Sequence, residues 1–95
     1  MEELTARGLT VTTAESCTGG RIAAAITAVP GSSKVFPGAI VSYCDRVKHQ
    51  VLSVPQELLD KYTAVSAPVA ESMASGAAAR METDLALSAT GLAGP

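Results

Sequence analysis

Ser16, Tyr43 and Lys48 are the side chains whose types could together break a covalent bond. A serine hydroxyl becomes a nucleophile when a neighbouring base removes its proton, and a lysine amine is one base that does so. Tyr43 ends an apolar stretch and Lys48 follows five positions later. The pattern indicates nucleophilic catalysis by Ser16 with Lys48 as the base. Tyr43 could relay the proton or steady the tetrahedral intermediate.

The expected position of Lys48 favours that role. If Asp45 is the N-cap of a helix, Lys48 is the third residue of the helix. The helix dipole disfavours a cation there, and partial burial disfavours the charged form as well. Both effects favour the neutral amine, which is the form that can accept a proton. The alternative is that Lys48 is a solvated surface residue and Tyr43 a core residue.

The turn that contains Ser16 is a candidate anion site. The segment 15–20 joins an expected strand to an expected helix, and unpaired N–H groups at a helix start attract a phosphate or an oxyanion. Gly19 and Gly20 lack side chains that would block a ligand, so we expect Thr18, Gly19 and Gly20 to contact the substrate. Alternatively, Ser16 or Thr18 only caps the helix.

The other reactive side chains are weaker candidates. Cys17 could be a nucleophile, but the only histidine, His49, adjoins Lys48 and has no acidic partner, so we expect Cys17 to be structural and His49 to lie on the surface. The sequence contains neither a set of residues with metal-ligand spacing nor a Walker or dinucleotide-binding motif. We therefore expect catalysis without a metal or a cofactor.

The positions of Ser16, Tyr43 and Lys48 depend on strands and helices that alternate along the sequence. Such alternation predicts right-handed crossovers and a mostly parallel sheet in a three-layer α/β/α sandwich. Ligands of such sheets bind beyond the carboxyl ends of the strands, where we also place Thr90 and Gly91 as substrate contacts. We expect strands over residues 9–14, 38–43 (covered on both faces) and 84–89. We expect helices over residues 2–8, for about 11 residues after Gly20, from Asp45 through Leu52, from Pro55 to Tyr62, and over 68–81 with Ser66 as the cap.

Composition narrows the class of partner. The 95 residues are enough for one domain, and a net charge of −2 gives no basic surface for nucleic acid or an anionic membrane. Two cysteines, an acidic N-terminus and the lack of a long apolar run predict a cytoplasmic protein with a small-molecule partner. The sequence ends directly after a strand that should be internal, so we expect residues 1–95 to be the N-terminal part of a longer single domain.

Five segments, 13–20, 29–33, 41–43, 64–66 and 90–95, resemble those of the CinA C-terminal family. The resemblance runs in order over residues 9–95 and is most specific in its first and last segments. This family is the amidohydrolase domain of the competence/damage-inducible protein, found alone or fused behind a molybdopterin-binding-like domain.

The resemblance implies nicotinamide mononucleotide deamidase activity with Ser16, Tyr43 and Lys48 as catalytic residues. It also implies one antiparallel strand in an otherwise parallel sheet, and we expect a homo-oligomer. The family domain is longer than this chain, and its later strands, its terminal helix and an arginine associated with the site have no counterpart here.

Two other functions remain open on the sequence alone. One is a non-catalytic nucleotide- or phosphate-binding module in which Lys48 is the counter-charge of the phosphate. The other is a structural or interaction domain that serves an attached domain.

Overall fold

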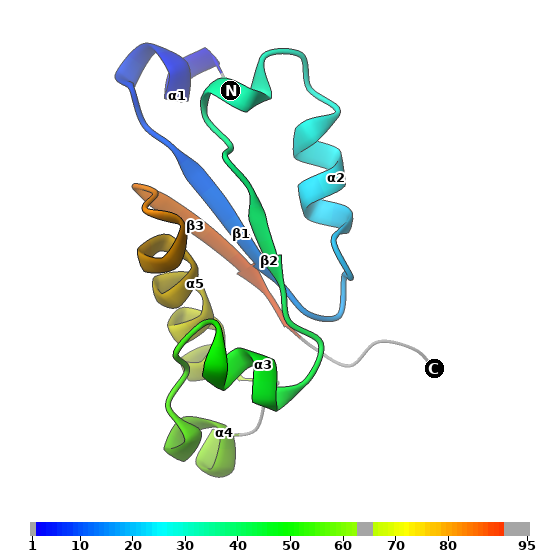
Figure 1. The fold of residues 1–95 in the computed structure, drawn as a ribbon, viewed down its shortest axis with the longest axis vertical. Coiled ribbons are helices and arrows are strands. Elements are labelled where there is room, and N and C mark those ends of the chain that lie inside the picture. The colour runs from blue at the N-terminus through cyan, green and yellow to red at the C-terminus, as the bar shows by residue number, and fades with distance from the viewer. Residues whose placement is uncertain (1, 63–65, 91–95) are drawn as a thin grey trace.

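The computed structural model describes residues 2–62 and 66–90. Three strands, β1 (Val11–Glu15), β2 (Ala39–Val41) and β3 (Leu85–Ala89), form a sheet in the order β2-β1-β3. Both neighbours of β1 run parallel to it, as Figure 1 shows. The expectation of an α/β fold with a largely parallel sheet is confirmed. The implied antiparallel strand is not among these three.

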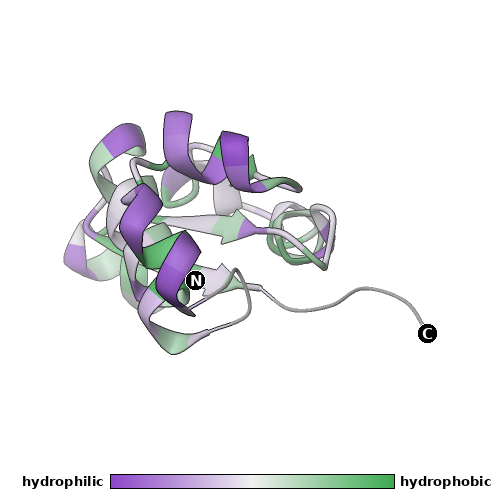
Figure 2. Ribbon diagram, turned by 90° about the horizontal axis from the view of Figure 1, so that it is seen from below, coloured by the Kyte–Doolittle hydropathy of each residue, from purple (hydrophilic) through white to green (hydrophobic). Residues whose placement is uncertain are grey.

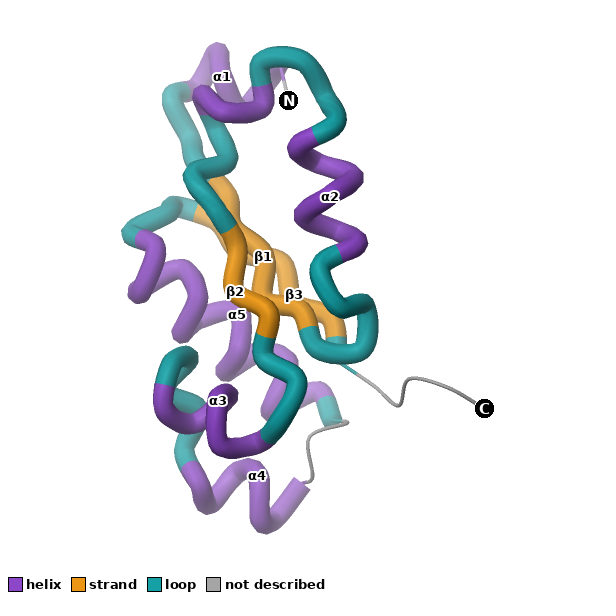
Figure 3. The backbone as a smooth tube through the Cα atoms, turned by 45° about the vertical axis from the view of Figure 1, so that its right-hand side comes forward, coloured by secondary structure: helices purple, strands orange, loops and turns teal. Residues whose placement is uncertain are grey.

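Helices cover both faces of this sheet. Helix α5 (Ala67–Met81) packs along one face, and α2 (Arg21–Thr27) lies over the opposite face (Figures 1 and 3). This gives the three layers predicted. The remaining helical segments are α1 (Glu2–Arg7), α3 (Asp45–Gln50), α4 (Gln56–Tyr62) and the short 3-10 helix η1 (Ser32–Lys34). Hydrophilic residues lie on helices around the outside, with the strands between them (Figure 2).

The fully buried strand is β1. All five of its residues are buried, because it has a strand on each side and helices above and below. The prediction that residues 38–43 form a strand covered on both faces is wrong: β2 is shorter, and Val41 is 48% exposed. The physical reason is that β2 lies at an edge of the described sheet, so part of its surface has no neighbour.

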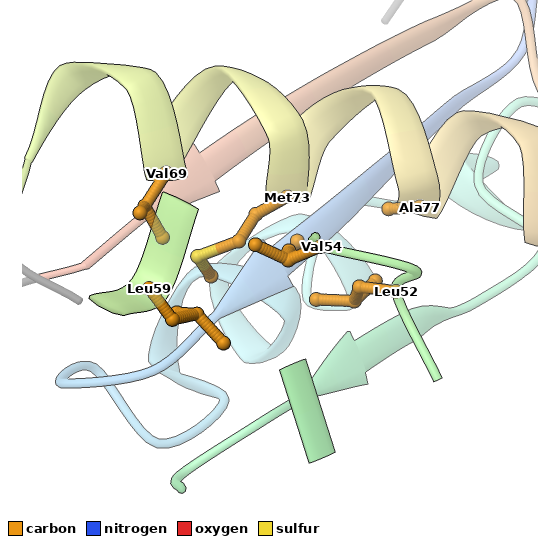
Figure 4. Packing of buried hydrophobic residues seen from close by; sticks show 7 residues of the cluster. Leu52, Val54, Leu59, Val69, Met73 and Ala77 are labelled. Carbon is orange, nitrogen blue, oxygen red and sulfur yellow. The ribbon is translucent and has the colours of Figure 1, made fainter. Parts of the chain in front are cut away.

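The hydrophobic core lies between α5 and the sheet and reaches α4. Its buried members are Ala14, Leu52, Val54, Leu59, Val69, Met73 and Ala77 (Figure 4). Gly76 lets α5 approach the segment after α3 closely, since a Cβ on this residue would lie 1.8 Å from the carbonyl oxygen of Leu52. This contact fixes the C-terminal end of α3, the helix that carries Lys48.

One helix start and one helix length differ from expectation, and the start of α5 agrees. Helix α3 has Cys44 as its N-cap, so Asp45 is the first helical residue and not the cap. Helix α2 has seven residues, shorter than expected. Helix α5 begins as predicted: the Ser66 side chain accepts a hydrogen bond from the N–H of Val69.

Candidate active site

A buried contact joins Ser16 and Lys48. Ser16 directly follows β1, and its N–H donates to the carbonyl oxygen of Ala89 at the end of β3 (3.0 Å). Lys48 comes from α3, and its Nζ lies 3.1 Å from Ser16 Oγ. Both side chains are buried, Lys48 with only 2% of its surface exposed. Two residues 32 positions apart therefore form the contact that serine–lysine catalysis requires.

The Lys48 amine is held by neutral groups. Besides Ser16, its Nζ contacts the carbonyl oxygen of Ser42 at 3.4 Å. The backbone is held as well, because the Lys48 carbonyl accepts from the N–H of Val54 (3.1 Å). The alternative of a solvated surface lysine is wrong. Lys48 is also the fourth residue of its helix, not the third, because the cap is Cys44.

His49 lies on the surface, as expected, and helps to hold the same turn. Its Nδ1 lies 2.8 Å from the carbonyl oxygen of Val54, the residue whose N–H bonds to Lys48. Cys17 is a partly exposed free thiol beside Ser16.

Tyr43 does not join the buried pair. Its side chain is 73% exposed, so it is neither the core residue of the alternative interpretation nor a partner of Ser16 or Lys48 in this conformation. The apolar run before it suggested a strand reaching to Tyr43, but β2 already ends at Val41. Because Lys48 contacts Ser16 directly, the geometry offers a proton path that does not pass through Tyr43.

Glu15 is a structural residue of the site that the sequence did not reveal. Its buried carboxylate accepts hydrogen bonds of 2.8 Å from Ile22 N–H and Ala23 N–H at the start of α2, and from the Thr18 hydroxyl. Burial raises the pKa of Glu15, but the hydrogen bonds from Ile22, Thr18, Ala23 and Thr13 outweigh it and hold the pKa below its ordinary value. The carboxylate thus fixes the turn that carries Ser16.

The N–H groups at the start of α2 already have hydrogen-bond partners within the fold. The N–H groups of Ile22 and Ala23 bond to Glu15, and the N–H of Gly19 donates to the Ser16 carbonyl (3.1 Å). The Glu15 carboxylate therefore lies at the N-terminus of α2, where the helix dipole favours a negative charge. Gly19 and Gly20 have φ angles of 59° and 103°. Glycine is favoured at both positions by this backbone conformation.

A pocket of about 380 Å³ opens beside Ser16, where β3 ends and α5 begins. Thr90, predicted as a substrate contact, follows β3 and lines this pocket. Ala89 also contributes, and its carbonyl accepts a hydrogen bond from the N–H of Ser16, so the backbone of Ser16 adjoins a residue of the pocket wall. Gly91 lies outside the described residues. The full lining is Ser66, Ala67, Ala70, Ser88, Ala89 and Thr90.

Residues 2–62 and 66–90 form neither a metal site nor a membrane-spanning helix. Within these ranges, no three His, Cys, Asp or Glu residues are grouped so that they could hold a metal ion. No helix of the described chain has the length and hydrophobicity needed to cross a membrane.

Known proteins resemble this chain in sequence and in structure. It is 53% identical over 88 residues to a CinA-like protein of Parasynechococcus marenigrum, covering 93% of this chain and 21% of the relative. It is 54% identical over 89 residues to a CinA-like protein of Dictyoglomus turgidum, covering 94% of this chain and 22% of the relative. A CinA superfamily structure from Escherichia coli superposes with a TM-score of 0.96 at 42% identity, covering 99% of this chain and 55% of that one.

The chain thus spans about a fifth of the length of these curated relatives, at 21% and 22%, and 55% of the solved chain. The family model described as the CinA C-terminal domain matches residues 1–95. On this evidence, the chain belongs to the CinA family.

Proposed function

We propose that this protein is an amidohydrolase that converts nicotinamide mononucleotide to nicotinate mononucleotide and ammonia. The observation that supports it best is the buried contact of 3.1 Å between Ser16 Oγ and Lys48 Nζ. This contact supports the reaction class, hydrolysis through a serine nucleophile. The substrate is inferred from the likeness of the motifs around these residues to those of the CinA family.

The reaction proceeds in two halves. Ser16 Oγ attacks the carboxamide carbon while Lys48 Nζ accepts its proton, giving a tetrahedral intermediate. Lys48 then returns a proton to the amide nitrogen and the C–N bond breaks. Ammonia departs, and the acyl group stays bound to Ser16 as an ester. In the second half, Lys48 accepts a proton from a water that attacks the ester carbonyl. The carboxylate product leaves and Ser16 regains its proton.

Backbone near Ser16 supplies the other contacts in this proposal. Oxyanions are commonly held by the N–H of the residue after the nucleophile, which is Cys17 here. The pocket lined in part by Thr90 takes the nucleotide part of the substrate in this proposal, and Gly91 stays a predicted substrate contact. Tyr43, whose side chain is 73% exposed, relays the proton or steadies the tetrahedral intermediate in this proposal.

A phosphate-binding module without catalysis fits the geometry less well. A counter-charge for phosphate must reach the ligand, but Lys48 is buried and points to the Ser16 hydroxyl. Glu15 also places a carboxylate at the start of α2, which opposes phosphate there. The arrangement favours proton transfer over charge neutralisation.

The test measures release of ammonia from nicotinamide mononucleotide by the whole protein without substitutions, called the parental protein, and by its Ser16→Ala and Lys48→Ala variants. We expect the parental protein to release ammonia and both variants to lose at least about 1,000-fold in kcat. Thr27→Ala is the control, because it removes a hydroxyl that bonds only within α2. Equal ammonia release by Ser16→Ala and the parental protein would rule out the proposal. Binding of the nucleotide without turnover by any form would favour the binding module.

The domain organisation belongs to this proposal as well. We infer that residues 1–95 form the first part of one CinA C-terminal-like domain. A homo-oligomer and a cytoplasmic location stay predictions.

A further inference from the structure

Ser42 carries a hydroxyl that the fold leaves without a partner. Ser42 follows β2 and is fully buried, and its N–H donates to the carbonyl oxygen of Glu15 (2.8 Å). Within the described ranges, Ser42 Oγ is the one buried side-chain nitrogen or oxygen that lacks a hydrogen bond. A buried hydroxyl without a partner costs free energy, and replacement by an apolar group of similar shape removes that cost. The presence of the Ser42 hydroxyl next to Lys48 therefore calls for an explanation.

The Lys48 amine lacks the complementary partner. A protonated lysine has three N–H donors. Two of them have acceptors here, Ser16 Oγ and the Ser42 carbonyl oxygen. Within residues 2–62 and 66–90, the third donor of Lys48 and the hydroxyl oxygen of Ser42 are thus a donor and an acceptor without partners. The carbonyl contact of 3.4 Å holds the amine next to Ser42. The position of the Ser42 hydroxyl relative to its own backbone is set by rotation about the Cα–Cβ bond, which has three staggered positions.

We propose that Ser42 Oγ accepts the third hydrogen bond of the Lys48 ammonium when Lys48 holds the proton taken from Ser16. The inference rests on the proposed function and adds a positioning residue to it. Ser42 keeps its own proton throughout, so it forms and breaks no covalent bond. Its hydroxyl stabilises the ammonium that holds the proton taken from Ser16, and it leaves the Ser16–Lys48 contact unchanged. Its effect therefore belongs to kcat and not to substrate binding.

The test compares Ser42→Ala with Thr12→Val in the whole protein. Ser42→Ala removes the hydroxyl without a partner, so we expect kcat to fall about 10- to 100-fold with KM changed less than about twofold. Its resistance to urea should equal or exceed that of the parental protein. The Thr12 hydroxyl, by contrast, donates to the Gly38 carbonyl at 2.6 Å, away from Lys48. Thr12→Val should lower resistance to urea and leave kcat of the folded protein unchanged.

Each result decides the matter. A Ser42→Ala variant with parental kcat would overturn the inference, as would one whose only defect is a raised KM or a lowered stability. Ser16→Ala is measured beside it. If Ser16→Ala is inactive while Ser42→Ala has parental turnover, the inference about Ser42 fails and the serine mechanism stands. If Ser16→Ala keeps parental turnover, the mechanism fails and the role of Ser42 fails with it.

Discussion

Ser16 and Cys17 are adjacent nucleophiles in different surroundings. Ser16 Oγ contacts the Lys48 amine, whereas Cys17 is a partly exposed free thiol. We expect Ser16→Ala to abolish deamidation and Cys17→Ala to retain at least about half of the parental kcat, because only Ser16 has a base in contact. Both rates are read from ammonia release, with circular dichroism to confirm folding. The reverse ranking would assign the nucleophile to Cys17.

Lys48 can be tested by a change that keeps its charge. Arginine holds its proton near neutral pH, so it cannot serve as the base. We expect Lys48→Arg to lose activity nearly as completely as Lys48→Ala, at least about 1,000-fold in kcat. Thermal unfolding of both variants separates a chemical defect from a packing defect. A folded Lys48→Arg protein with near-parental turnover would instead support the phosphate-binding module.

Glu15 makes stability depend on pH. Its folded-state pKa is held below 4.5, the ordinary value, by hydrogen bonds that outweigh the effect of burial. Its stabilising contribution is therefore present at pH values above 4.5 and is lost as the pH falls through the lowered folded-state pKa. Glu15→Gln should lower the free energy of unfolding by about 1–3 kcal/mol at neutral pH and weaken its acid dependence. Urea titrations at neutral and acidic pH measure both. An unchanged acid dependence would show that Glu15 is not the group responsible.

At the scale of elements, α5 approaches the segment that follows α3 through Gly76. A Cβ at this position would lie 1.8 Å from the Leu52 carbonyl oxygen, which is backbone and cannot rotate away. Gly76→Ala should therefore destabilise the fold by about 1–3 kcal/mol, although alanine has the higher helix propensity. Ser75→Ala, at the exposed neighbouring position of α5, is the control and should be nearly neutral. Equal urea midpoints for the two variants would contradict the contact.

Local patterns predicted the elements better than their boundaries. The N-cap at Ser66 was readable because a serine accepts a hydrogen bond from an N–H only three residues away. Glu15 was missed because its carboxylate caps α2 from seven and eight residues before the N–H groups. Ser42 and the exposure of Tyr43 were missed for a related reason. Which side of a short strand is buried depends on neighbouring elements, and those are not encoded nearby.

At the scale of the whole molecule, one face of β3 is apolar and uncovered. Leu85 is 45% and Leu87 57% exposed, and both lie on the side of the sheet to which Thr13 also points. We expect a polypeptide of residues 1–95 alone to fold poorly and to self-associate through this face. Joint replacement of both leucines by lysine should shift its elution on a sizing column towards the monomer. Val29→Lys, at a site 40% exposed in the loop after α2, should not. A soluble, cooperatively unfolding monomer of the parental 95 residues would contradict this expectation.

The central claim is that Ser16 becomes acylated with Lys48 as its base. The most direct measurement is peptide mass analysis of the protein after its reaction with nicotinamide mononucleotide is quenched in acid. We expect an adduct with the mass of the substrate less ammonia on the peptide that contains Ser16. The parental protein should carry this adduct, and the Ser16→Ala variant should lack it. An adduct on Cys17, or ammonia release by Ser16→Ala at the parental rate, would contradict it.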